Sequence, residues 1–128
     1  MESKLVRRPV NTAVVQGSAV TFECVSHVNV NNSGIHWFNS VCVKNNFGTC
    51  TPTDYIYNSF SGLGGKYRSS RRFSVTEANN ATHVTRNVNI NSAQLSDAGV
   101  YLCVEFAGAE NGQMSSAQLI VLGKKDLS

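Results

Sequence analysis

Cys24, Trp37 and the run from Asp97 to Cys103 (Asp-Ala-Gly-Val-Tyr-Leu-Cys) constrain this chain more than any other feature of its sequence. The two cysteines stand far apart, the tryptophan follows the first one closely, and Tyr101 lies shortly before the second. This order of residues is typical of two β-sheets that face each other across a core. The pattern indicates a scaffold for recognition rather than for catalysis.

The composition fits one globular domain over residues 1–128, with a core from about residue 10 to 122. Hydrophobic residues make up 41% of the chain and charged residues 15%, so disorder is not expected. No apolar run approaches the ~20 residues that a membrane span needs. The net charge of +3 is too small to indicate a nucleic-acid partner.

Four cysteines in a chain of this size indicate two disulfides and an oxidising compartment. The sequons at Asn31 and Asn80 agree with this and make both asparagines candidate glycosylation sites. We therefore expect an extracellular domain, either secreted or the ectodomain of a membrane protein. Because no apolar leader follows Met1, we expect an N-terminal part of a longer ectodomain, attached to a membrane only through a segment outside this sequence.

Short β-rich runs separated by turn residues predict an all-β, antiparallel sandwich. In residues 19–24, for example, Val20, Phe22 and Cys24 alternate with polar residues, which predicts a half-buried strand. Further strands are expected at 10–15, 34–38, 54–57, 72–75, 83–90, 100–106 and 117–122. Loops or turns are expected at 26–34, 45–48, 59–65, 95–99 and 108–114.

With these elements the chain resembles the V-set of the immunoglobulin superfamily over residues 10–122. The stretch from Trp37 to Phe73 is long enough for two additional strands, and Arg72-Phe73-Ser74 resembles the start of the family's strand D. The resemblance implies an immunoglobulin-like fold: a two-sheet antiparallel sandwich with Greek-key connections.

The resemblance also implies a disulfide between Cys24 and Cys103 that joins the two sheets, with a tryptophan packed against it. The other signature residues of the core are expected to be Trp37, Tyr101, Arg72 and Asp97. The arginine and the aspartate would form a bidentate ion pair across the bottom of the sandwich. The tyrosine would hydrogen-bond back to the chain just upstream.

The chain departs from the antigen-receptor members of this family at two places. Their strand G begins with Phe-Gly-x-Gly, whereas residues 113–117 here read Gln-Met-Ser-Ser-Ala. The segment after the tryptophan reads Phe38-Asn39-Ser40 and lacks the glutamine through which those domains pair. Both differences argue against a rearranging antigen receptor.

Cys42 and Cys50 flank the expected turn at 45–48. A hairpin would bring their Cα atoms to the ~5.5–6 Å that a disulfide prefers, so we expect a second bridge. It would act either as a simple staple or as a support for a ligand-binding loop. The cysteine and histidine spacing lacks the pattern of a zinc site, and we expect neither a metal nor a cofactor.

Strand alternation, with Trp37, Tyr101 and Cys103 pointing inward, turns several apolar side chains toward the outer face of one sheet. An exposed apolar patch usually marks an interface, so we expect partners to bind there. The alternative is that a neighbouring domain or the loop at 108–114 covers this face. The candidate partner-binding residues are His36, Phe38, Ser40, Tyr55, Tyr57, Leu102, Val104, Phe106 and Ile120.

A basic run provides a second candidate site. Lys66, Arg68 and Arg71 would suit an anionic ligand such as a bacterial surface polymer or a sulfated glycan. The alternative is an ordinary solvated strand edge.

Our first hypothesis is an extracellular recognition domain of an immune-type receptor, which binds a protein or a microbial surface ligand through this face and its loops. The alternative is a cell-adhesion module that pairs with its own copy, as a homodimer, or with a relative. A spacer domain in a longer array is a third hypothesis. We expect no enzyme, because the histidines lie on separate elements and no nucleophile stands in a recognisable motif.

Overall fold

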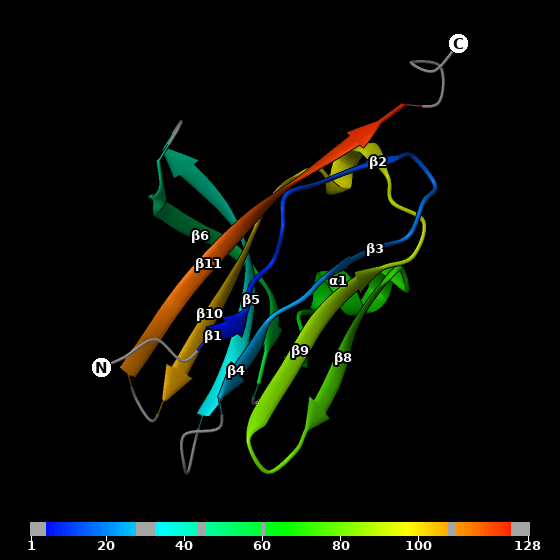
Figure 1. The fold of residues 1–128 in the computed structure, drawn as a ribbon. Helices are drawn as coiled ribbons and strands as arrows, with labels where there is room; N and C mark the ends of the chain where they lie inside the picture. The colour runs from blue at the N-terminus through cyan, green and yellow to red at the C-terminus, as the bar shows by residue number, and fades with distance from the viewer. Residues whose placement is uncertain (1–4, 28–32, 44–45, 60, 108–109, 124–128) are drawn as a thin grey trace.

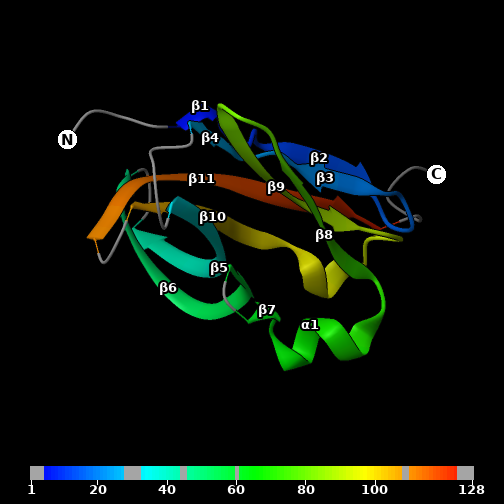
Figure 2. The ribbon, with the colours of Figure 1, turned by 90° about the horizontal axis from the view of Figure 1, so that it is seen from below.

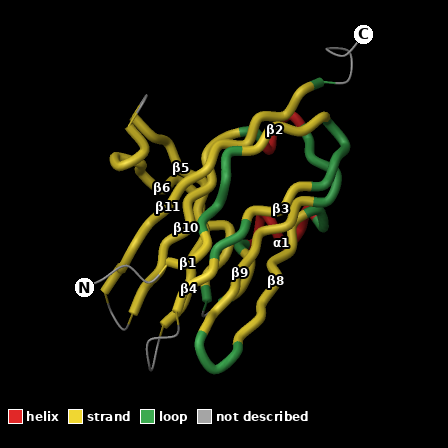
Figure 3. Tube along the Cα trace, in the orientation of Figure 1, coloured by secondary structure: helices red, strands yellow, loops and turns green. Residues whose placement is uncertain are grey.

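The expected all-β sandwich is confirmed by a computed structural model, which describes residues 5–27, 33–43, 46–59, 61–107 and 110–123. Side chains at positions 33, 41–43, 46–52, 106, 107 and 110–112 lie outside this description. Strands dominate the described chain (Figure 3), and they form two layers (Figure 2). None of the helices in these ranges is long and apolar enough to cross a membrane.

One layer, the back sheet, is built around a long central strand. Its strands are β1 (Leu5–Arg7), β4 (Val25–His27), β9 (His83–Ile90) and β3 (Val20–Phe22) in that order, with β8 (Phe73–Asn79) also paired to β9. β3 covers only the middle of the strand expected at 19–24, whereas β4 follows it and extends into the loop expected at 26–34. Both strands pair antiparallel with β9. In Figure 1, β9 lies between β8 on one side and β3 and β4 on the other.

The other layer, the front sheet, carries the signature tryptophan and tyrosine. Its order is β2 (Thr12–Val15), β11 (Glu110–Leu122), β10 (Gly99–Ala107), β5 (Ser33–Val43), β6 (Asn46–Asn58) and β7 (Gly62–Leu63). Only the β2–β11 pair is parallel among the described ladders. The N-terminal segment thus contributes β1 to the back sheet and β2 to the front sheet.

The segments expected to be loops contain more regular structure than the sequence predicts. The loop expected at 108–114 is largely strand, because β10 and β11 stay paired from Gly99–Leu119 to Ala107–Glu110. The turn expected at 45–48 is largely strand as well, since β6 begins at Asn46. The stretch at 59–65 contains β7 and leads into a short helix, α1 (Gly65–Ser70).

The core contains the predicted disulfide and the predicted tryptophan beside it. Cys24 and Cys103 form the disulfide between the sheets, and Trp37, paired with Cys103 in the ladder, is fully buried beside them. The indole Nε1 donates a hydrogen bond to the carbonyl oxygen of Arg86 at 2.8 Å, which satisfies its only polar group. Phe22 stacks on Tyr101 with ring centroids 5.0 Å apart. The two sheets are therefore joined both covalently and by aromatic packing.

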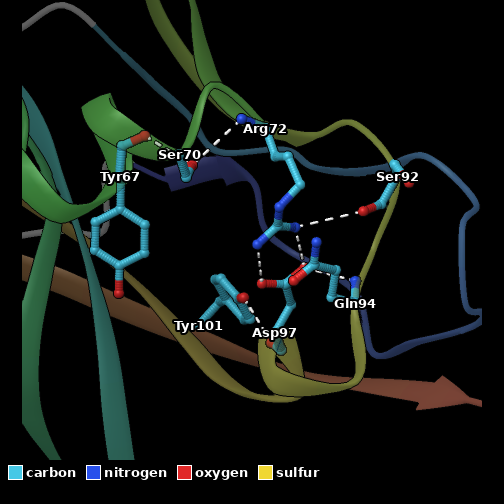
Figure 4. Close-up of polar contacts among 7 residues, drawn as sticks. All are labelled: Tyr67, Ser70, Arg72, Ser92, Gln94, Asp97 and Tyr101. Carbon is cyan, nitrogen blue, oxygen red and sulfur yellow. Dashed lines mark hydrogen bonds and ion pairs between the residues drawn. The ribbon is translucent and has the colours of Figure 1, made fainter.

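The predicted ion pair closes the bottom of the sandwich (Figure 4). Arg72 donates from Nη1 to Asp97 Oδ2 at 2.5 Å and from Nη2 to Asp97 Oδ1 at 3.0 Å. Tyr101 donates its hydroxyl to the Asp97 carbonyl oxygen at 2.7 Å, and burial raises the pKa of this tyrosine. Asp97 belongs to a short 3₁₀ turn, η1 (Leu95–Asp97), whose start it caps through the Gln94 N–H at 2.8 Å. The ion pair therefore joins the start of β8 to the turn that precedes β10.

Candidate functional site

The outer surface of the front sheet, called the front face below, is defined by two rows of cross-strand neighbours. In the first row, Tyr55, Phe38, Leu102 and Ser116 follow one another across β6, β5, β10 and β11. In the second row, His36, Val104 and Met114 do the same on β5, β10 and β11. Cross-strand neighbours on one face lie close enough for their side chains to touch, so the rows form one surface.

Leu102 and Val104 form the floor of the front face. They alternate with the core residues Tyr101 and Cys103 along β10 and do not belong to the core cluster. They point outward, as predicted, but are only 2% and 4% exposed. On β5 their cross-strand neighbours are Phe38 and His36. The expectation that both residues are exposed is therefore corrected: they support the surface from below.

The rim of the front face is exposed. Tyr55 and Met114 are among the large hydrophobic residues that the solvent reaches, and Met114 is 53% exposed. Phe38 is half-buried between them. Met114 was missed by the sequence analysis because residues 108–114 were assigned to a loop. Extending the alternation of the final strand toward its start would have placed it on this face.

A β-bulge separates the two tyrosines of β6. Phe38 pairs with Tyr55 but Trp37 pairs with Tyr57, so one extra residue is inserted between them. Tyr57 consequently points inward and is buried in the core cluster. Its hydroxyl donates to Glu77 and accepts from Arg86 Nε at 3.1 Å, and burial raises its pKa. The assignment of Tyr57 to the partner-binding face is wrong.

Gly64 supports the position of Tyr55. Its N–H donates to the Ile56 carbonyl oxygen at 2.9 Å, and a Cβ atom at Gly64 would lie only 2.8 Å from the Tyr55 carbonyl oxygen. A side chain there would collide with the backbone of β6. The glycine therefore allows the chain after β7 to lie directly against the strand that carries Tyr55.

His36 keeps the front face uncharged. The ring lies 6.3 Å, centroid to centroid, from the ring of Phe38, and burial lowers its pKa from the ordinary value of 6.5. The imidazole is therefore neutral at pH 7. None of the residues in the two rows that the structure describes carries a formal charge at that pH.

The other candidates for this face lie at its margins or outside the description. Ser40 is buried near the bottom of β5, and Ile120 is exposed farther along β11, where it pairs with Ala13 of β2. Phe106 lies in β10 opposite Gly34, but its side chain is outside the described residues. These three positions remain predicted members of the partner-binding surface.

A cavity of about 280 Å³ opens at the bottom of the sandwich, beside α1. Its polar wall includes Asn39, Tyr67, Arg72 and Asp97, and Asn39 donates to the Tyr67 hydroxyl. Burial raises the pKa of Tyr67. Asn39 and Tyr67, and likewise Arg72 and Asp97, are bonded to each other, whereas the buried Ser40 hydroxyl that also lines the cavity has no hydrogen-bond partner among the described residues.

The predicted anionic-ligand residues lie on α1 and at its end, away from the front face. Lys66 Nζ is 3.6 Å from Asp54 Oδ2, and Arg68 Nη2 donates to the Leu63 carbonyl oxygen at 2.8 Å. Arg71 is exposed and ends the helix in a left-handed conformation with φ 60°. Their role in ligand binding stays a prediction.

Two further predictions concern covalent modification. Asn80 is exposed in the turn between β8 and β9, whereas Asn31 lies outside the described residues. The side chains of Cys42 and Cys50 are also outside the description. The backbone pairs Val41–Thr51 and Val43–Asn46 place both cysteine positions in the β5–β6 hairpin, with a register irregularity between the two pairs. The second disulfide remains a prediction.

Glu105 is a buried carboxylate that sequence reasoning did not single out. It accepts a hydrogen bond from the Ser26 hydroxyl at 2.8 Å and one from the Gln113 N–H at 3.3 Å. It lies on the inner side of β10 and connects the back sheet to β11. Within the described residues, no group of three or more histidine, cysteine or acidic side chains could hold a metal ion.

The comparisons agree with this architecture. The family model for the immunoglobulin V-set domain matches residues 7–122. The Ig1 domain of mouse SynCAM 2 is similar in structure, with a TM-score of 0.62 and 21% identity over 95% of this chain and 98% of that one. No curated protein matches the sequence. No enzyme family is indicated.

Two other similar structures contain paired domains. One is described as Dpr1 IG1 bound to DIP-eta IG1, with a TM-score of 0.60 and 18% identity over 95% of this chain and 97% of that one. The other is the RIG-5 IG1 homodimer, with a TM-score of 0.60 and 13% identity over 94% of this chain and 98% of that one. At such identities the likeness concerns the fold.

Proposed function

The chain belongs to the immunoglobulin V-set family, and we propose that it is an extracellular recognition domain that binds another immunoglobulin-type domain through its front face. V-set domains are usually extracellular and are typically non-enzymatic binding modules. The disulfide between Cys24 and Cys103 fits an oxidising compartment.

The observation that carries the proposal is the character of the front face. Its two rows carry the aromatic side chains of Tyr55 and Phe38 and the thioether of Met114, and they contain no formal charge at pH 7. Leu102 and Val104 between them are almost inaccessible to solvent. The centres of protein–protein interfaces have this composition: charged residues are depleted, while tyrosine, phenylalanine and methionine are enriched. A surface spread over four neighbouring strands also suits a second sheet better than a thin polymer.

This chemistry favours an adhesion-type protein partner over a microbial polymer. An anionic polymer needs exposed cations, whereas the described basic residues of α1 lie off the front face and Lys66 already faces Asp54. Two of the similar structures hold immunoglobulin domains in pairs, which supports the same kind of partner here. An immune-type receptor that recognises a protein would use the same face, and the identity of the partner distinguishes the two roles.

The test measures binding of the purified domain to itself and to an array of V-set ectodomains. Sedimentation over a wide concentration range detects self-pairing, and biosensor binding detects other partners. Met114→Arg places a charge on the rim, while Ala78→Arg places the same charge on the exposed edge of the back sheet. We expect Met114→Arg to weaken binding at least tenfold and Ala78→Arg to leave it unchanged. A partner that binds both variants equally well would overturn the proposal.

A further inference from the structure

Two histidines lie side by side on the back sheet, away from the front face. His27, the last residue of β4, and His83, the first residue of β9, are direct cross-strand partners. Their ring centroids are 4.6 Å apart and their planes differ by 33°. His27 is exposed and His83 is half-buried, so solvent and dissolved ions reach the pair.

The turn that precedes β9 orients the His83 ring. The Thr82 hydroxyl donates its hydrogen to Asn80 Oδ1 at 3.1 Å. The same hydroxyl oxygen lies 2.7 Å from His83 Nδ1, and with its hydrogen already used it acts there as the acceptor. His83 Nδ1 is then the protonated nitrogen, and Nε2 carries the free lone pair. Asn80 Oδ1 also accepts from the N–H groups of Thr82 and His83, both at 2.8 Å, which holds the turn in place.

A histidine that binds a metal ion usually donates its other ring N–H to an oxygen, which fixes the tautomer and the ring orientation. The chain from Asn80 through Thr82 to His83 has this arrangement before any ion is bound. The opposing His27 ring supplies a second imidazole, whose centroid lies 4.6 Å from that of His83.

We propose that His27 and His83 form a binding site for a divalent late transition-metal ion, Cu²⁺ or Zn²⁺, with Thr82 as the positioning residue. Imidazole nitrogens suit these ions, and affinity for such a site rises from Zn²⁺ to Cu²⁺. Because the described residues offer no third ligand of the histidine, cysteine or carboxylate type, water or a partner molecule completes the coordination. The site is independent of the proposed function of the front face.

The experiment titrates the folded domain, with its disulfide intact, with Cu²⁺ and with Zn²⁺. Calorimetry measures stoichiometry and affinity, and electron paramagnetic resonance counts the nitrogen ligands of bound Cu²⁺. We expect one ion per chain with two imidazole nitrogens, and at least tenfold weaker binding in His27→Gln and in His83→Gln.

Thr82→Val tests the positioning role. Loss of an outer-shell partner typically weakens metal binding about 10–100-fold, and we expect a loss of this size in Thr82→Val. Thr82→Ser keeps the hydroxyl, so we expect it to bind the ion with the affinity of the unaltered domain. Thr76→Val, at an exposed threonine of β8 on the same sheet, serves as the matched control and leaves affinity unchanged. Unchanged binding in the His27→Gln/His83→Gln double variant would overturn the site. Unchanged binding in Thr82→Val would overturn the role assigned to Thr82.

Discussion

Phe38 lies directly opposite Leu102 in the β5–β10 ladder, on the outer face of the front sheet. Leu102 is nearly inaccessible although it points away from the core, whereas Phe38 remains half-exposed above the sheet. The front face is therefore organised as a dry floor with an exposed rim. This division predicts different consequences for substitutions at neighbouring positions of one surface.

Leu102→Ala is expected to behave as a core substitution. Loss of a buried leucine side chain costs about 2–5 kcal/mol of unfolding free energy, because transfer energy is lost and a cavity remains. Met114→Ala, at an exposed rim position, is expected to cost less than about 1 kcal/mol. Urea denaturation of both variants checks this. Similar small losses at the two positions would show that Leu102 is not part of a packed floor.

His36 predicts a pH dependence of stability. Because burial lowers the pKa of His36 below 6.5, the unfolded chain binds a proton at a higher pH than the folded chain. The stability that depends on neutral His36 is fully present above pH 6.5 and is lost as the pH falls toward the folded pKa. Thermal melts between pH 7.5 and 5 should show a decline that is smaller in His36→Gln. An identical decline in both proteins would contradict this assignment.

The Arg72–Asp97 pair is expected to contribute much more than the exposed pair of Arg7 and Glu23. Asp97 has a side chain only 6% exposed, so Arg72→Ala leaves a buried carboxylate without its cation and costs about 3–5 kcal/mol. Arg72→Lys keeps the charge but loses the bidentate geometry, and an intermediate loss is expected. Arg7→Ala breaks a solvent-exposed contact of 3.7 Å and costs less than about 1 kcal/mol. Equal losses for Arg72→Ala and Arg7→Ala in chemical denaturation would contradict the account.

Glu105 is expected to be required as a hydrogen-bond acceptor. Glu105→Ala leaves the Ser26 hydroxyl and the Gln113 N–H without this partner in a buried site, and we expect a loss of about 2–4 kcal/mol. Glu105→Gln retains one carbonyl acceptor of the same shape and should cost less. Chemical denaturation of both variants measures the two losses of unfolding free energy. A Glu105→Ala variant as stable as the unaltered domain would exclude a structural role for Glu105.

The features that could be predicted from the sequence are those written into short local motifs. The Asp97-to-Cys103 run, together with Cys24 and Trp37, carries the family resemblance that implied the disulfide and the tyrosine hydrogen bond, and the structure contains both. Arg72 and Asp97 were predicted through the family resemblance, and the structure confirms their bidentate contact.

The features that could not be predicted depend on pairing between distant segments. The bulge that turns Tyr57 inward inserts one residue into β6 without a local sequence signal, and it reverses the simple alternation of the strand. Residues 110–113 are polar or glycine, which led to their assignment to a loop, whereas β11 already pairs with β10 at Glu110. Helix α1 is too short to show helical periodicity. Strand alternation places Leu102 and Val104 on the outer side of β10 but does not predict that they are buried.

The most direct test of the central proposal is the oxidation of Met114 by hydroxyl radicals, measured by mass spectrometry in the free domain and in its complex with the partner found by the binding array. Met114 is exposed in the free domain, and Met1 is the only other methionine, which provides an internal reference. We predict that complex formation protects Met114 strongly while Met1 reacts as before. Undiminished oxidation of Met114 in a saturated complex would show that the partner binds elsewhere and would contradict the account.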